Sequence, residues 1–208
     1  EGYTETGDAN DNVLLGDGGN DTISGMAGND VLDGNSDNDH LYGGEGDDEL
    51  FGGSGTDTLY GEEGGDLLDS GSGDDFLVGG DGNDILTGKI GSDTFVYNTA
   101  NDTHDEGQDT ITDFDLNEDV LSFHEVLDAD DDGIETALDA EELAFAQSVD
   151  ITVNGVDVTL TSSGAGTSIT IEGINETGAF DAYDGGSLDS LIGDGMLNVE
   201  INPDTFAS

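Results

Sequence analysis

Residues 79–87 read GGDGNDILT, and residues 43–51 read GGEGDDELF in the same frame. Both follow the pattern G-G-x-G-x-D-x-U-x, in which U is apolar and x varies. The aspartate of this pattern recurs every nine residues, and Asp11 precedes the series by ten; its members are Asp21, Asp30, Asp39, Asp48, Asp57, Asp66, Asp75, Asp84 and Asp93. Self-similarity at a fixed period is typical of a solenoid built from stacked units.

An apolar residue lies two positions after each of these aspartates. The ten residues are Val13, Ile23, Leu32, Leu41, Leu50, Leu59, Leu68, Leu77, Leu86 and Phe95. Because hydrophobic residues make up only 33% of the chain, ten matches in ten positions have a chance probability on the order of one in 10⁵. The apolar residues and the aspartates therefore share one period.

The composition is strongly acidic and excludes several classes of protein. The 208 residues include 51 Asp and Glu, one Lys or Arg, 35 Gly and no Cys, and the net charge is −50. We expect no direct binding to nucleic acid or insertion into a membrane, since the chain has no clustered basic residues and no long apolar run. Disulfide bonds and zinc–thiolate sites are excluded because cysteine is absent.

A charge of this size opposes a compact state unless cations neutralise it. The interpretations are a disordered acidic tail, the acidic surface of a salt-adapted protein, or a chain that folds around bound cations. The regular placement of the aspartates favours the last. The first residues, Glu1-Gly2-Tyr3, include no initiator Met and no signal sequence, so we expect a fragment of a longer protein that is monomeric by itself.

The nonapeptide resembles the calcium-binding repeat of RTX (hemolysin-type) proteins over about residues 6–95. The resemblance implies an all-β fold in which residues 1–97 form a calcium-bound parallel β-roll, a solenoid. Each ion would lie between turns n and n+2, held by both motif aspartates and by carbonyl groups of the glycine turns. The implied turn ligands are Gly25, Gly28, Gly43, Gly44, Gly46, Gly52, Gly53, Gly55, Gly61, Gly64, Gly71, Gly73, Gly79, Gly80 and Gly82.

The repeat geometry agrees with this resemblance. The x-U-x triplet suits a minimal strand with U pointing inward, and the glycines allow a sharp turn. Two nonapeptides make one coil, so residues eighteen apart are stacked. Leu32, Leu50, Leu68 and Leu86 then line one inner sheet, and Ile23, Leu41, Leu59, Leu77 and Phe95 line the other.

The same stacking arranges the aspartates in two columns that need counter-cations. Two bare carboxylates about 5 Å apart repel by about 3 kcal/mol at an effective dielectric of 20. Carboxylate and carbonyl oxygens suit Ca²⁺ better than metals that prefer nitrogen or sulfur. We expect about eight ions, and a chain that is unfolded at cytosolic calcium and folded outside the cell.

Some copies depart from the pattern. Asp37 stands where the third glycine belongs, so the sequence does not decide the backbone conformation of that turn. Leu15 is an extra residue between the first two copies, so Asp11 belongs either to a full site or to a capping turn.

Residues 98–208 form a second, different segment, which we expect to be a β-rich cap with one or two short helices. Strands are predicted at 95–97, 110–112, 120–123, 168–171 and 196–201, and helices at 136–147 and around 188–192. Asn154-Gly155, between two short β-prone runs, predicts a hairpin.

Residues 92–96, 109–114 and 118–121 resemble the region that closes the roll in serralysin-type proteases and in large type I secreted adhesins. The resemblance implies a further calcium site near Asp109. It also implies that the type I secretion machinery recognises the C-terminus, and that the protein is secreted and lies outside the cell or at its surface.

A separate acidic loop, Asp128-Ala129-Asp130-Asp131-Asp132-Gly133, has the D-x-D-x-D-G opening of a helix-loop-helix calcium site. Asp128, Asp130 and Asp132 would be ligands, and Asp139 stands where the bidentate Glu usually lies. The alternative is a solvated acidic loop before a helix, and the sequence leaves both open.

No catalytic constellation accompanies these motifs, so we do not expect an enzyme. His40, His104 and His124 lack the spacing of a zinc protease, and no G-x-S-x-G elbow occurs.

The favoured function is a calcium-binding module with the secretion signal of a large bacterial adhesin. The alternative is the stabilising module of a secreted metalloprotease, lipase or alginate epimerase. An ice-binding roll is less favoured, because no Thr ladder accompanies the residues that precede the motif aspartates.

Overall fold

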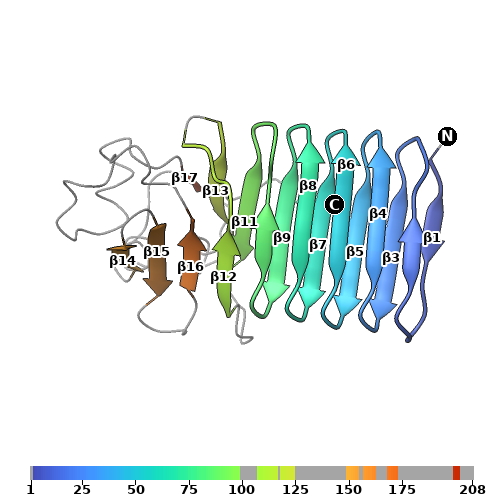
Figure 1. Ribbon diagram of the computed structural model, residues 1–208, viewed down its shortest axis with the longest axis horizontal. Helices are drawn as coiled ribbons and strands as arrows, with labels where there is room; N and C mark the ends of the chain where they lie inside the picture. The colour runs from blue at the N-terminus through green and yellow to red at the C-terminus, as the bar shows by residue number, and fades with distance from the viewer. Residues whose placement is uncertain are drawn as a thin grey trace, which may run out of the picture.

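The computed structural model of the chain describes residues 2–98, 107–116, 118–124, 149–154, 157–162, 168–172 and 199–201. All regular structure in these ranges is β-strand, so none of them belongs to a helix that could cross a membrane. The strands wind into a coil along the long dimension of the molecule, with the N-terminus at one end (Figure 1). The predicted all-β parallel solenoid is confirmed; both predicted helices lie outside the described residues.

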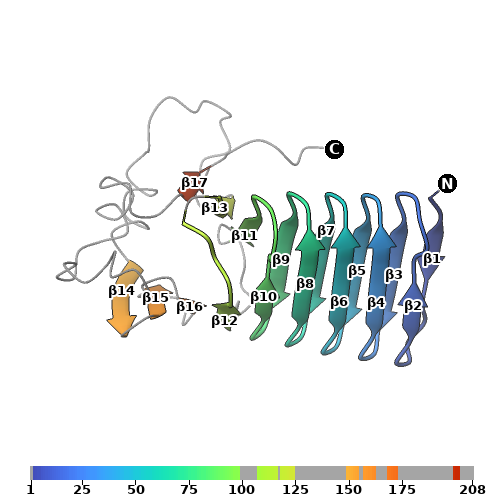
Figure 2. The same ribbon diagram turned by 45° about the horizontal axis from the view of Figure 1, so that its top comes forward.

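Two sheets face each other across the coil (Figure 2). The odd sheet contains, in spatial order, β1 (Thr4–Thr6), β3 (Thr22–Ala27), β5 (His40–Glu45), β7 (Thr58–Glu63), β9 (Phe76–Asp81), β11 (Thr94–Asn98), β13 (Val120–His124) and β17 (Val199–Ile201). The even sheet contains β2 (Val13–Leu15), β4 (Val31–Ser36), β6 (Glu49–Ser54), β8 (Leu67–Ser72), β10 (Ile85–Thr87), β12 (Gln108–Ile111), β16 (Ser168–Ile171), β15 (Asp157–Ser162) and β14 (Val149–Asn154).

Residues eighteen apart are paired through the repeats. Leu50 pairs with Leu32 and Leu68, which confirms that two nonapeptides complete one coil. Strands β3 to β9 are six residues long, twice the predicted triplet. They are longer because pairing resumes after the first glycine of each turn, where Gly53 pairs with Gly71.

A single file of apolar side chains from each sheet fills the interior. The fully buried residues of the repeats are Ile23, Leu32, Leu41, Leu50, Leu59, Leu68, Leu77, Leu86 and Phe95, which confirms nine of the ten predicted inward positions. The prediction for Val13 is wrong, because Val13 is 69% exposed and Leu14 is buried instead. β2 pairs Leu14 with Leu32, so the first copy is shifted by one residue relative to the others.

The turn with Asp37 in place of the third glycine forms despite the substitution. Asp37 has a φ of 73° and Asn35 a φ of 70°, both in the left-handed region that glycine adopts most readily. Oδ2 of Asp37 accepts the N–H of Gly19 in the preceding coil at 3.0 Å. This hydrogen bond offsets part of the strain of the left-handed backbone.

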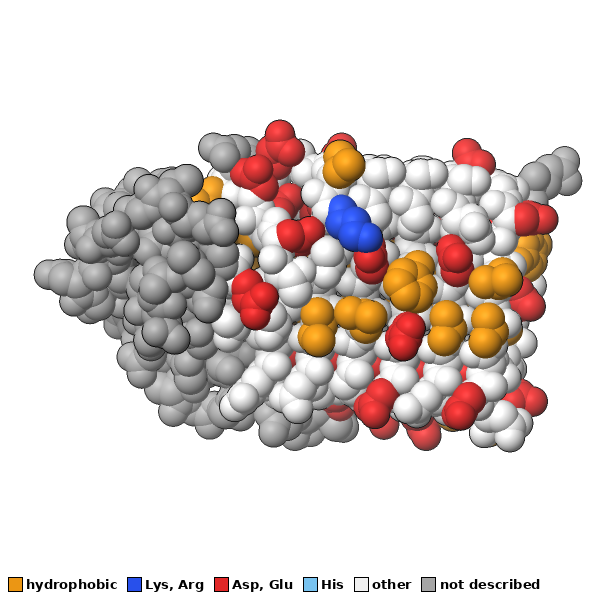
Figure 3. Space-filling model, viewed as in Figure 1, with side chains coloured by type: hydrophobic (Ala, Val, Ile, Leu, Met, Phe, Trp, Pro, Cys, Tyr) orange, Lys and Arg blue, Asp and Glu red, His pale blue; other side chains and the backbone are white. Residues whose placement is uncertain are grey.

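The outer faces of the two sheets differ. On the even sheet, apolar side chains form a row that is interrupted by one acid (Figure 3); its members in register are Val13, Val31, Glu49, Leu67 and Ile85. On the odd sheet, Tyr42 and Tyr60 stack with ring centroids 5.1 Å apart.

The sheets continue past the repeats through the strands of the second segment. The predicted strands at 95–97, 110–112, 120–123 and 168–171 correspond to β11, β12, β13 and β16, and β17 lies within the last prediction. β14 and β15 pair in antiparallel fashion, which confirms the hairpin, but Asn154 lies opposite Asp157 at the end of β14 instead of in the predicted two-residue turn. β15 also pairs in antiparallel fashion with β16.

We expect Leu59→Ala to lower the free energy of unfolding of the calcium-saturated chain by about 2–5 kcal/mol, because it leaves a cavity in a file one side chain wide. Leu15→Ala, at a 54% exposed position on the even sheet, is the control and should change it by less than about 0.5 kcal/mol. Urea unfolding in excess calcium measures both, and equal effects would contradict the single-file core.

Candidate metal centre

Two columns of buried aspartates run along the coil, one at the edge of each sheet. The even column contains Asp30, Asp48, Asp66, Asp84 and Asp109, and the odd column contains Asp21, Asp39, Asp57, Asp75, Asp93 and Asp119; all are at most 3% exposed. In each column, Oδ1 of an aspartate accepts the backbone N–H of the aspartate one coil earlier, at 2.7 to 3.1 Å. One oxygen of every carboxylate therefore links neighbouring coils.

The second oxygen of most of these carboxylates has no partner in the described part of the chain. Buried Oδ2 atoms without a hydrogen bond occur in Asp21, Asp30, Asp39, Asp48, Asp57, Asp66, Asp75, Asp84 and Asp109. A buried polar atom without a partner costs free energy, and native proteins contain few of them. Their regular recurrence indicates a position that a ligand fills.

The first glycine of each turn lets these oxygens come close to a backbone carbonyl of the next coil. A Cβ placed on Gly52 would lie 2.7 Å from Oδ2 of Asp57 and 2.6 Å from the carbonyl oxygen of Ser70 in the next coil. An oxygen of the carboxylate and a carbonyl oxygen of the next coil therefore lie close together beside the first glycine, which has no side chain to displace them. The equivalent carboxylate and carbonyl oxygens of the other turns lie within 3 Å of a Cβ placed on Gly16, Gly25, Gly34, Gly43 and Gly61.

The predicted glycines occupy two kinds of position. Gly25, Gly43, Gly52, Gly61 and Gly79 are first glycines, where a Cβ would lie within 3 Å of the Oδ2 of the motif aspartate of the same turn. The second and third glycines have positive φ and shape the turns; they are Gly28, Gly44, Gly46, Gly53, Gly55, Gly64, Gly71, Gly73, Gly80 and Gly82.

Ser70 stands in the place of a first glycine and was not predicted. Its Oγ donates to the carbonyl oxygen of Gly88 at 3.0 Å, and the side chain is fully buried. Burial raises the pKa of Asp75, whose Oδ2 has no hydrogen-bond partner among the described residues. The sequence signal is SGSG in residues 70–73, where other copies begin with glycine.

Asp11 lies outside the columns. It is exposed, and Oδ1 accepts the N–H of Asn29 at 3.0 Å. Asn12 occupies the column position instead, because its N–H donates to Oδ1 of Asp30 at 2.7 Å. On the odd side the corresponding residue is Tyr3, whose N–H donates to Oδ1 of Asp21 at 2.9 Å. The position one coil before the first aspartate of each column therefore has no carboxylate.

Burial makes the ionised form of the column aspartates costly. It raises the pKa to about 6 in Asp39, Asp48 and Asp84, to about 7 in Asp57, Asp66 and Asp93, and to about 8 in Asp109. In Asp66 the carboxylates of Asp84 and Asp48 raise the pKa further, and the N–H of Asp48 opposes the rise. At neutral pH the columns need cations to hold their charge.

The one Lys or Arg of the sequence does not neutralise the columns. Lys89 is the one Lys or Arg in the sequence, and its Nζ forms an ion pair with Asp69 on the outer side of β8. Among the described residues, no group of three or more His, Cys, Asp or Glu side chains could hold a metal. A bound ion therefore needs backbone carbonyls beside the carboxylates, which are the hard oxygen ligands that Ca²⁺ prefers.

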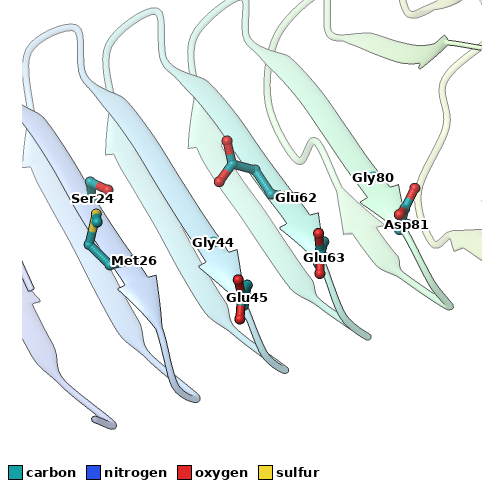
Figure 4. Close-up of a pocket in the computed structure, with 8 residues that line it drawn as sticks. All are labelled: Ser24, Met26, Gly44, Glu45, Glu62, Glu63, Gly80 and Asp81. Carbon is teal, nitrogen blue, oxygen red and sulfur yellow. The ribbon is translucent and has the colours of Figure 1, made fainter. Parts of the chain in front are cut away.

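A second acidic feature lies on the outer side of the odd sheet. A shallow groove is lined by Glu45, Glu62, Glu63 and Asp81, from β5, β7 and β9 (Figure 4). Glu45, Glu62 and Glu63 are exposed, so water can stabilise their charges.

The predicted loop ligands Asp128, Asp130, Asp132 and Asp139 lie outside the described residues.

The model of one protein family matches the chain. The RTX calcium-binding nonapeptide repeat is found in four copies, at residues 6–41, 33–68, 60–95 and 69–103. Residues 6–103 belong to the RTX calcium-binding repeat family. The RTX repeat is a calcium-binding module, so the resemblance drawn from the nonapeptide is confirmed.

Two solved structures resemble the chain. The extracellular lipase LipA from Serratia marcescens has 18% sequence identity and a TM-score of 0.36; the match covers 83% of this chain and 38% of the lipase chain. The AlgE6R3 subunit of the mannuronan C5-epimerase from Azotobacter vinelandii has 29% identity and a TM-score of 0.28, with 67% and 73% coverage. A search of curated proteins gave no match.

Alanine at a first glycine tests the space beside Oδ2. Gly52→Ala should raise the calcium concentration at the folding midpoint about tenfold, because its Cβ would lie 2.7 Å from Oδ2 of Asp57 and 2.6 Å from the carbonyl oxygen of Ser70 and would displace these two oxygens. Gly65→Ala is the matched control, since its Cβ would lie 3.4 Å from the nearest atom, and should leave the midpoint unchanged. Calcium titration followed by circular dichroism measures the midpoint; equal midpoints would contradict this placement of the ion.

The raised pKa values predict how the calcium-free chain responds to pH. The pKa of Asp66 rises from 3.8 to about 7 in the coil, so the coil binds more protons than the unfolded chain between these values. Its stability without calcium should therefore be greatest at low pH and be lost as pH rises through about 6 to 8. Circular dichroism in chelator should show more strand at pH 5 than at pH 8; equal spectra would contradict the prediction.

Proposed function

We propose that this chain is a module that folds when its aspartate columns bind calcium. The observation that supports it most directly is the series of buried Oδ2 atoms without partners in the described residues, which recurs at every nonapeptide from Asp21 to Asp84. Each of these carboxylates must be protonated or neutralised by a cation, and the adjoining carbonyls suit a hard cation. Because the unfolded chain has no formed site, calcium binding and folding are one equilibrium.

This equilibrium fits a secreted protein. Extracellular calcium modules bind with dissociation constants of about 10⁻⁴–10⁻³ M, so they are empty at cytosolic calcium and occupied outside the cell. The chain would leave the cell unfolded through the type I secretion machinery, which recognises its C-terminus. It would then fold outside the cell or at its surface.

The parent protein that we propose is a large bacterial adhesin. The support is the resemblance of residues 92–96, 109–114 and 118–121 to the closing region of secreted adhesins. In that setting the roll contributes stability and export rather than catalysis. An HExxH motif in the preceding sequence would instead assign the module to a secreted protease.

Chelation tests the proposed function. With millimolar calcium the chain should show the circular dichroism of β-strands, and excess EGTA at pH 7.5 should convert it to an unfolded spectrum that calcium restores. Magnesium at the same concentration is the control. It should not restore the fold, because Mg²⁺ demands short, nearly octahedral coordination. Unchanged strand content in the chelator would refute the proposal.

A further inference from the structure

The first coil, residues 2–15, closes its turn with an amide where the coils that follow have a carboxylate. Gly7 holds the position of a first glycine, since a Cβ placed on it would lie within 3 Å of Oδ1 of Asn12 and of the carbonyl oxygen of Gly25. In the next coil of the same sheet, a Cβ on Gly25 would lie within 3 Å of Oδ2 of Asp30. The amide oxygen of Asn12 therefore takes the place of a carboxylate oxygen that has no partner in the later coils.

The amide of Asn12 finds its hydrogen-bond partners inside its own turn. Its Oδ1 accepts the N–H of Asp8 at 2.8 Å, and its Nδ2 donates to Oδ1 of Asp8 at 3.4 Å. Oδ1 of Asp8 also accepts two hydrogen bonds from Asn10, at 3.0 and 2.7 Å. Asp8 is exposed, and the side chains of Asn10 and Asn12 hold its pKa below the ordinary value by hydrogen bonding. No buried carboxylate of this turn thus requires a cation.

On the odd sheet, the first coil ends the interior file with a charged residue. β1 pairs Glu5 with Ile23, so Glu5 stands where the later strands have an inward apolar residue. The hydroxyl of Tyr3 lies within hydrogen-bonding distance of Oε2 of Glu5, at 3.2 Å, and of the carbonyl oxygen of Leu15 in β2. The side chain of Tyr3 thus joins β1 to β2, the two strands at this end of the sheets.

These features are those that protect an open sheet edge. β1 and β2 are edge strands of three residues each. Short edge strands and inward-pointing charges keep sheet edges from pairing with another chain, and the terminal units of solenoids need a polar covering. A second copy stacked on this end would bury the carboxylate of Glu5 without a basic partner, because Lys89 is the one Lys or Arg and pairs with Asp69.

We infer that residues 2–15 form an N-terminal cap that closes this end of the roll without calcium, and that Glu5 keeps a second copy of the chain from stacking on it. The absence of calcium from the cap has meaning only if the columns bind calcium, as proposed above. Asn12 ends the even column one coil before Asp30, and Tyr3 ends the odd column one coil before Asp21. This end of the roll is thus closed by the chain's own side chains.

Restoring the carboxylate should create a calcium site in the cap. Asn12→Asp should bind one ion more than the unaltered chain, because it places a carboxylate beside the carbonyl of Gly25 and one coil before Asp30. Asn20→Asp is the matched control and should leave the count unchanged. Asn20 is exposed, and its Oδ1 accepts the N–H of Asn38, which a carboxylate can also do.

Native mass spectrometry in calcium counts the ions, and circular dichroism checks that each variant is folded. An unchanged count in Asn12→Asp, or a gained ion in Asn20→Asp, would overturn the calcium-free cap.

Asp48→Asn separates failure of this inference from failure of the proposed function. Asp48 has an aspartate neighbour on each side in its column, so its replacement should remove at least one ion if the columns bind calcium. A loss in Asp48→Asn without a gain in Asn12→Asp would overturn only the calcium-free cap. No loss in Asp48→Asn would overturn the function itself.

Analytical ultracentrifugation tests Glu5. In calcium and about 0.5 M salt, which screens the repulsion between two acidic chains, Glu5→Leu should sediment with about twice the mass of the unaltered chain, because two copies stack through one end each and the assembly closes at the dimer. Glu45→Leu makes the same exchange at an exposed position of β5 and should remain monomeric. A monomeric Glu5→Leu, or a dimer of the control or of the unaltered chain, would overturn this part of the inference.

Discussion

The coils of the repeats depend on carboxylates that are buried and only half satisfied. Oδ1 of Asp57 accepts an N–H from the coil before it, whereas Oδ2 is buried without a partner in the described chain. The first oxygen sets the register of the coils, and the second makes the register costly at neutral pH unless a cation is bound. The geometry that stacks the coils and the need for calcium therefore come from the same side chain.

Few other interactions stabilise the fold. The interior is one file of side chains per sheet, such as Leu50 over Leu68, and the chain has one basic residue against 51 acidic ones. A larger core would tolerate some repulsion between charges. Here the apolar contacts link only neighbouring coils, so neutralising the columns decides whether the coils form.

The period of nine determines most of the fold and most of the site in advance. It gives the inward residues, the columns and the turn glycines wherever the spacing is regular. It fails where the spacing changes: the interval of ten before Asp21 puts Asn12 and Leu14, rather than Asp11 and Val13, in the repeated positions. Asp119 follows Asp93 by 26 residues, so no period leads to it; only the D-x-U sequence of Asp119-Val120-Leu121 marks the position. The extra length of the strands depends on pairing between turn residues such as Gly44 and Glu62, which follow no apolar pattern.

The alternation of nonapeptides between two sheets constrains how such a roll can change length. Deleting nine residues would leave each interior position apolar, yet every later segment would move to the opposite sheet. The apolar row that includes Leu67 and the ring stack of Tyr42 and Tyr60 would then be divided between the two outer faces. Deleting eighteen would preserve both faces. The interior thus keeps its apolar pattern when the chain changes by one nonapeptide. The outer faces available to other molecules keep their composition only when it changes by two.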